Sequence, residues 1–166
     1  MNRQQGFTLL EILIAVFIFA VGFLGAGALQ MTSMQSNQNN FYRTQAIFIA
    51  NEIANHMRAN QGEVINGNSF DNIDTKIFSA TANACKTSSE GCNGEDLASN
   101  SILEWSNNFK SENGMPAVLP NGSGKIIRQQ DSNNFEITIL WNERDWKGNT
   151  NSRENKTAEY SLIVSF

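Results

Sequence analysis

The sequence has little charge, one histidine and no basic run. Lys, Arg, Asp and Glu make up 17% of the 166 residues, and the formal net charge is −4. An acidic chain without a basic patch lacks the electrostatic footprint of a nucleic-acid-binding protein. We therefore expect no nucleic acid partner. The single histidine, His56, would have to serve any Ser-His-Asp triad, and no nucleophile elbow accompanies it. A surface or interface histidine is the better interpretation.

Motifs of cofactor and metal sites are incomplete. Residues 122–125 read Gly-Ser-Gly-Lys, like the end of a phosphate loop, but Leu119 stands where the earlier glycine is required. Asp71 and Asp74 lack the remaining ligands of a dedicated calcium loop, so a solvated face is the simpler explanation. The sequence predicts no enzyme, no cofactor and no metal site.

Charge is also absent from a long N-terminal stretch. No charged side chain lies between Glu11 and Arg43, and Ile12–Leu29 carries no hydrogen-bonding side chain. A helix over residues 7–29 would be about 35 Å long, enough to cross a hydrocarbon core of about 30 Å. Glu11 is therefore a single carboxylate near the start of a predicted membrane-spanning helix, where an unpaired charge is costly.

Two processing sites are compatible with this N-terminus. Residues 25–28, Gly-Ala-Gly-Ala, resemble the end of a secretory signal peptide. Alternatively, the short polar leader 1–6 ends in Gly6 directly before the apolar run, and cleavage there keeps the helix in the mature protein. Glu11 favours the second site, because a signal-peptide core does not favour a charge. Arg3 in the leader predicts a cytoplasmic N-terminus, with the rest of the chain across the membrane.

Residues 6–11, Gly-Phe-Thr-Leu-Leu-Glu, resemble the class III signal of type IV pilins and type II secretion pseudopilins. The resemblance implies that a prepilin peptidase cuts between Gly6 and Phe7 and that Phe7 becomes N-methylated. It also implies that Glu11 pairs with the N-terminus of a neighbouring subunit and sets axial register in a fibre. The implied partners are other minor and major pilins, the prepilin peptidase and the pilus assembly machinery of the inner membrane.

Residues 42–46 and 51–60 are similar to the region after the membrane helix in the PilV type of minor pilin, and Trp141 after the strand 135–140 also fits that type. The resemblance implies a minor pilin that takes part in initiating type IV pili in a tip complex, for twitching motility or adhesion. It implies a single-pass inner-membrane protein with a periplasmic head, later part of the extracellular pilus.

Other functions stay open on the sequence alone. A minor pseudopilin of a type II secretion system shares the leader, the glutamate and the architecture. A tip adhesin or DNA-uptake module is a rival of another class, with Trp146 and the loop 142–157 as a contact surface. An enzyme anchored by an uncleaved signal is a further alternative.

The predicted helix continues after the apolar segment. Residues 30–60 contain no proline, and an apolar face recurs at spacings of three and four. Phe41 and Phe48 lie beside this face and are expected to pack in the same core, and Gln61-Gly62 is expected to end the helix. The face consists of Tyr42, Ala46, Ile49, Ile53 and Met57.

Three glycines interrupt the apolar segment at Gly22, Gly25 and Gly27. Each costs the helix on the order of 1 kcal/mol relative to alanine. They favour close packing of helices through small residues, with Gly22 four residues from Ala26. The alternative is a segment that unwinds when the subunit enters a fibre.

The head is predicted to combine helix and strand. Cys85 and Cys92 are the only cysteines, and in an extracytoplasmic head they are expected to form a disulfide. A short helix is expected over residues 95–110, with Ile102, Trp105 and Phe109, together with Leu97, on one face. Alternating patterns predict antiparallel strands, at 125–129, 134–141 and 158–166.

The sequence thus predicts an α+β protein in four parts. A cleaved leader, 1–6, precedes a transmembrane and assembly helix, 7–29. An amphipathic continuation of that helix, 30–60, packs on a globular extracytoplasmic head, 61–166, which holds a small antiparallel sheet.

Overall fold

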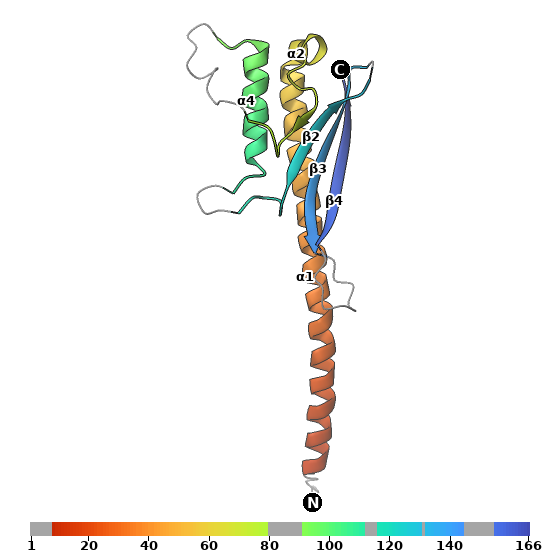
Figure 1. The fold of residues 1–166 in the computed structure, drawn as a ribbon. Helices are drawn as coiled ribbons and strands as arrows, with labels where there is room; N and C mark the ends of the chain where they lie inside the picture. Colours follow the sequence, from red (N-terminus) through yellow and green to blue (C-terminus); the bar gives the residue numbers. More distant parts are fainter. Residues whose placement is uncertain (1–7, 80–90, 112–115, 131, 145–154) are drawn as a thin grey trace, which may run out of the picture. The chain divides into compact units, whose positions relative to one another are not determined.

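The computed structural model describes residues 8–79, 91–111, 116–130, 132–144 and 155–166 (Figure 1). The chain divides into two compact units, Met1–Gln38 and Asn39–Phe166. Helix α1, Leu9–Ala59, contributes the described residues of the first unit from Leu9 onward and continues into the second. The predicted continuation of the N-terminal helix is therefore confirmed.

The N-terminal part of α1 is apolar and exposed. An 18-residue window of the helix has a mean hydropathy of 2.7, and none of that window is buried. By length and composition it is a candidate membrane span. The helix runs through Gly22, Gly25 and Gly27, where an added Cβ would meet nothing within 4 Å.

The second unit is an α+β head, as predicted. Among the described residues, the elements after α1 are two helices, α2 (Gln61–Asn66) and α4 (Gly94–Asn107), and four strands. All neighbouring strands pair antiparallel, in the order β1-β2-β3-β4 (Figure 1). The strands are β1 (Ile73–Asp74), β2 (Ser123–Arg128), β3 (Asn134–Arg144) and β4 (Asn155–Ser165).

The core of the head lies between α1, α4 and the inner face of the sheet. Ala46, Ile53 and Met57 of α1 are fully buried, which confirms the predicted apolar face. Alternation along β3 turns one row of side chains toward these helices, because successive strand residues point to opposite faces. This buried row consists of Phe135, Ile137, Ile139 and Trp141.

Two aromatic side chains do not pack where the sequence predicts. Phe41 is 53% and Phe48 is 64% exposed, so the expectation that they join the core is wrong. At about 100° per residue both lie roughly 120–140° around the helix from Ile53, beyond the reach of the sheet. Leu97 of α4 is likewise 38% exposed, whereas Ile102 of the same helix is buried.

The end of α1 also differs from the prediction. The helix stops at Ala59, and Gln61-Gly62 opens α2 instead of ending a helix. Asn60 makes the break: it is 9% exposed, and its side-chain amide donates to the carbonyl of Gly94 at 2.6 Å. This partner lies 34 residues away in sequence, so local patterns do not reveal it.

Trp105 joins three elements of the head. Its indole Nε1 donates to the carbonyl of Ile49 in α1 at 2.9 Å, and its ring meets Phe109 edge-to-face at 5.5 Å. The ring lies directly against the backbone of Gly124 in β2, where an added Cβ would overlap it. Only glycine allows this approach, so Gly124 fixes how closely the sheet lies to α4.

Gly124→Ala should lower the free energy of unfolding by about 1–3 kcal/mol, because the new methyl group forces the Trp105 ring out of its site. Gly62→Ala is the matched control: a Cβ there meets nothing within 4 Å, and alanine in a helix should be neutral or stabilise by up to about 1 kcal/mol. Denaturant unfolding of the full chain in detergent, followed by tryptophan fluorescence, measures both. Equal stability of the two variants would contradict this packing.

Candidate functional site

The first turn of α1 holds Glu11 and is capped by Thr8. The backbone N–H of Glu11 donates to Oγ1 of Thr8 at 3.3 Å and to its carbonyl at 3.1 Å. Thr8 therefore satisfies an N–H group that would otherwise lack a partner at the helix start. Sequence reasoning missed this residue, although Thr-x-x-Glu before an apolar run is the signature of a capping box.

The carboxylate of Glu11 is exposed and has no partner among the described residues. It lies at the positive end of the helix dipole, which favours a negative charge there. The neighbouring side chains on its face are apolar: Ile12, Ala15 and Val16 lie beside it around an open surface hollow. In an apolar environment such a carboxylate requires a cationic partner from another group.

The predicted processing site lies outside the described residues. Gly6 and Phe7 precede the described part of the chain, so the cleavage between them and the N-methylation of Phe7 remain predictions. Helix α1 begins two residues after Phe7, at Leu9. A cut at this position would create a new α-amino group four residues before Glu11 in the sequence.

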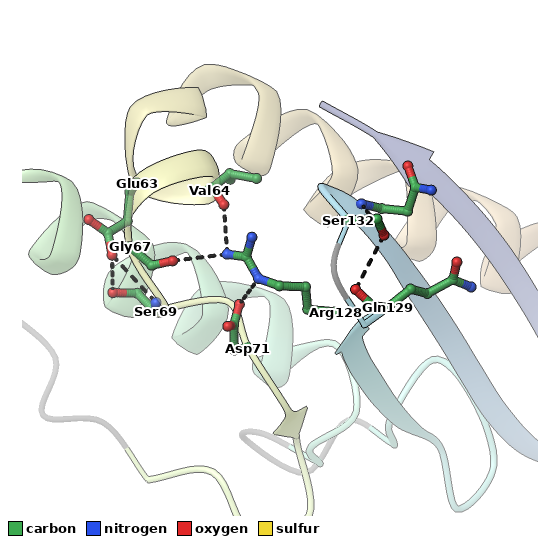
Figure 2. Close-up of polar contacts among 9 residues, drawn as sticks. Glu63, Val64, Gly67, Ser69, Asp71, Arg128, Gln129 and Ser132 are labelled. Atoms are coloured by element: carbon green, nitrogen blue, oxygen red, sulfur yellow. Dashed lines mark hydrogen bonds and ion pairs between the residues drawn. The ribbon is translucent and has the colours of Figure 1, made fainter.

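In the head, Arg128 ties the sheet to helix α2 (Figure 2). Its guanidinium donates from Nε to Oδ1 of Asp71 at 2.9 Å and from one terminal nitrogen to the carbonyls of Val64 and Gly67 at 2.7 and 2.9 Å. These carbonyls belong to the last turn and the C-cap of α2. The positive charge thus satisfies orphan acceptors at the negative end of that helix.

The same guanidinium stacks over an aromatic ring. Its carbon lies 4.5 Å from the ring centroid of Phe135, a cation–π distance. Because Phe135 is fully buried in β3, Arg128 links α2, β2 and β3 at one point. Sequence reasoning singled out neither Arg128 nor its role, since its partners lie 57 to 64 residues away.

The two aspartates considered for calcium form ion pairs. Asp71 pairs with Arg128, and Asp74 pairs with Lys125 of β2 at 3.4 Å. Asp74 also accepts a hydrogen bond from the N–H of Lys76 at 3.0 Å. Within the described ranges no group of three or more His, Cys, Asp or Glu side chains is placed to hold a metal ion.

Of the remaining residues singled out from the sequence, some lie within the described residues and others do not. His56 is half-buried on α1, and Trp146 lies outside the described residues. Cys85 also lies outside them, while Cys92 is described and is not free. Their pairing remains a prediction. Residues 123–128 form strand β2, so Lys125 does not follow a phosphate loop.

Comparison with known families gives two matches that run consecutively along the chain. Residues 1–27 match the family model of the prokaryotic N-terminal methylation motif. Residues 28–102 match the model described as type IV pilin Tt1218. No curated protein and no solved structure matches the chain.

The motif, the long apolar helix and the α+β head define a subunit with a class III signal and a structural role. These two matches support a type IV pilin. Other pilins and the prepilin peptidase are the partners that this family implies, and the N-terminus fits an inner-membrane protein that is later assembled into pili.

Arg128→Ala should lower the free energy of unfolding by about 2–4 kcal/mol, because it removes charge-assisted hydrogen bonds and leaves Asp71 and two carbonyls without a donor. Lys125→Ala is the control: its pair with Asp74 is more exposed, with 43% of the lysine side chain accessible, and its loss should change stability by less than about 1 kcal/mol. Urea unfolding of both variants measures the difference. A loss for Lys125→Ala as large as that for Arg128→Ala would refute the assignment.

Proposed function

We propose that this chain is a minor pilin of the PilV type that takes part in initiating type IV pili. Its similarity to that type over residues 42–46 and 51–60 supports the subtype. The observation that carries the function is Glu11, a carboxylate without a described partner near the start of a helix whose most apolar 18-residue window has no buried residue. Such a helix is stable only in lipid or against other apolar helices.

During assembly, Glu11 would fix the axial position of each subunit relative to its neighbour. After cleavage at Gly6, Phe7 carries an α-amino group that is protonated in much of the population near pH 7. When the helix leaves lipid and packs among other pilin helices, the carboxylate of Glu11 is neutralised by the N-terminus of a neighbouring subunit. A buried pair of opposite charges is tolerated in one axial position only, because any other leaves both charges unpaired.

The proposal includes the four parts of the chain and its topology. The leader 1–6 faces the cytoplasm, residues 7–29 cross the inner membrane, residues 30–60 continue the helix, and the head 61–166 lies in the periplasm before assembly. Cys85 and Cys92 form a disulfide in the oxidising compartment. The finished subunit lies in a complex near the pilus tip.

The mature chain should lack Met1–Gly6 and carry one added methyl group on Phe7. Intact-mass measurement of the protein from pili or membranes tests this directly. Without reductant, neither cysteine should react with an alkylating agent, and both should react after reduction. An intact leader, or cleavage after residues 25–28, would exclude the pilin-type processing proposed here.

Glu11→Ala should be processed and inserted normally but should enter pili at least about tenfold less often than the unchanged chain, because the register pair is lost. The control is Glu52→Ala, which removes a carboxylate of the same helix that accepts a hydrogen bond from Asn108 in the head. Quantitative immunoblots of sheared pili and membranes give the ratio. Equal incorporation of Glu11→Ala and the unchanged chain would show that no register pair forms.

The phenotype of a strain that lacks this chain distinguishes a pilus subunit from a subunit of a type II secretion system. Loss of surface pili and of twitching motility supports a pilus-initiating minor pilin. Intact pili together with a block in exoprotein release would assign the chain to the minor pseudopilins of type II secretion instead.

A further inference from the structure

Strand β4 forms a long edge of the sheet. It pairs with β3 at eleven consecutive positions, from Asn155 to Ser165, without a bulge. In the described part of the chain no strand pairs with its other side. The opposite edge, β1, has only two residues. Native sheets shorten, bulge or charge their edges, because free backbone groups of a long edge pair with other chains.

The hydrogen-bond pattern shows which backbone groups of β4 are free to pair outward. The N–H of Phe166 donates to the carbonyl of Asn133 at 3.1 Å, so these two residues form a hydrogen-bonded pair. Because such pairs alternate with non-bonded ones along an antiparallel ladder, even-numbered residues of β4 bond to β3. The odd-numbered residues turn their N–H and C=O groups to the open side. They are Thr157, Glu159, Ser161, Ile163 and Ser165, and all five are exposed.

The second half of β4 has the composition of a pairing strand. Residues 160–166 read Tyr-Ser-Leu-Ile-Val-Ser-Phe, with no charge, proline or glycine. Uncharged segments of this length with high β-propensity are the ones that add to other strands. Tyr160 and Leu162 are only half-buried beside the core, and Ile163 on the other face is 61% exposed. A strand added here would cover apolar surface on both faces.

We propose that β4 accepts an extended strand from a different subunit of the same fibre. This rests on the proposed function, since the fibre supplies the neighbour. The incoming strand should be uncharged and apolar at alternate positions opposite 160–166. At its other end it should carry an acidic residue opposite Lys156 and a basic one near Glu159, because opposite charges stabilise cross-strand pairs. Backbone hydrogen bonds give such strand addition its affinity, and the side chains give its specificity.

A second copy of the chain fits this edge less well. Within the head, β4 runs in the same direction as the adjoining part of α1 (Figure 1). Antiparallel pairing of two β4 strands would reverse these helix segments relative to each other, whereas subunits of one membrane or fibre point the same way. Parallel pairing in register would place Lys156 and Glu159 beside their own copies, and like charges in that position are destabilising.

The test is residue-resolved amide hydrogen exchange on the full chain in detergent, alone and co-purified with each of the other pilin subunits of the same pilus. In one of these complexes the amides of Glu159, Ser161 and Ile163 should exchange about a hundredfold more slowly than in the free chain. The amides of Tyr160 and Leu162, which already bond to β3, should be protected in both. This alternation distinguishes an added strand from general shielding of the surface.

A proline variant tests the same contact through affinity. Ser161→Pro removes one outward N–H and leaves every bond to β3 in place, so an edge strand tolerates it. It should weaken the complex at least about tenfold, the loss of roughly one buried hydrogen bond. The control Ser161→Ala keeps the N–H and should bind like the unchanged chain.

Three results would overturn the proposal. The first is unchanged exchange of the odd-numbered amides in every complex. The second is equal binding by folded Ser161→Pro and Ser161→Ala; if the proline variant does not fold, the exchange pattern of the unchanged chain decides. The third is protection that appears in the chain alone and rises with its concentration, which would assign the edge to a second copy. Loss of the pilus phenotype on deletion is measured separately, so the proposed function and this contact fail independently.

Discussion

A carboxylate without a partner on an apolar helix is the constraint on which the rest of this protein depends. Nothing in the described part of the chain neutralises Glu11, and the helix that carries it buries none of its most apolar window. Lipid satisfies the apolar surface but not the charge. In the assembly that we propose, a neighbouring pilin would satisfy both, and the assembled fibre would be the state in which the whole helix is stable.

Within the head, helix α1 has one face that is buried against the sheet and an opposite face that is exposed. In the head unit one face of the helix is committed to the sheet through Ile53 and Met57, and Trp105 donates to its backbone at Ile49. The opposite face keeps Phe41 and Phe48 exposed. Arg128 and Gly124 then hold α2, α4 and the sheet in fixed positions around that helix. Several specific contacts therefore hold the head to the helix, while no strand in the described part of the chain pairs with the outer edge of β4.

Most elements were predictable because their signals are local. The apolar period of α1 lies within one helix and the alternation of β3 and β4 lies within each strand, and the structure confirms both patterns. The misses concern contacts between distant segments. Phe41 and Phe48 are apolar beside an apolar face, and only the position of the sheet decides which side of the helix is covered. Asn60 ends α1 through a residue 34 positions away.

The sequence by itself indicated the class of this protein, because its signals are local. The class III signal, Glu11 and the apolar run lie next to one another along the chain. It also determined the α+β composition, since helix and strand periods differ. Only the tertiary structure decided that Arg128 caps α2, that the ring of Trp105 lies against Gly124 and that β4 is the last strand of the sheet among the described residues. Those three facts depend on strand order and on side chains brought together across the fold, which no local pattern encodes.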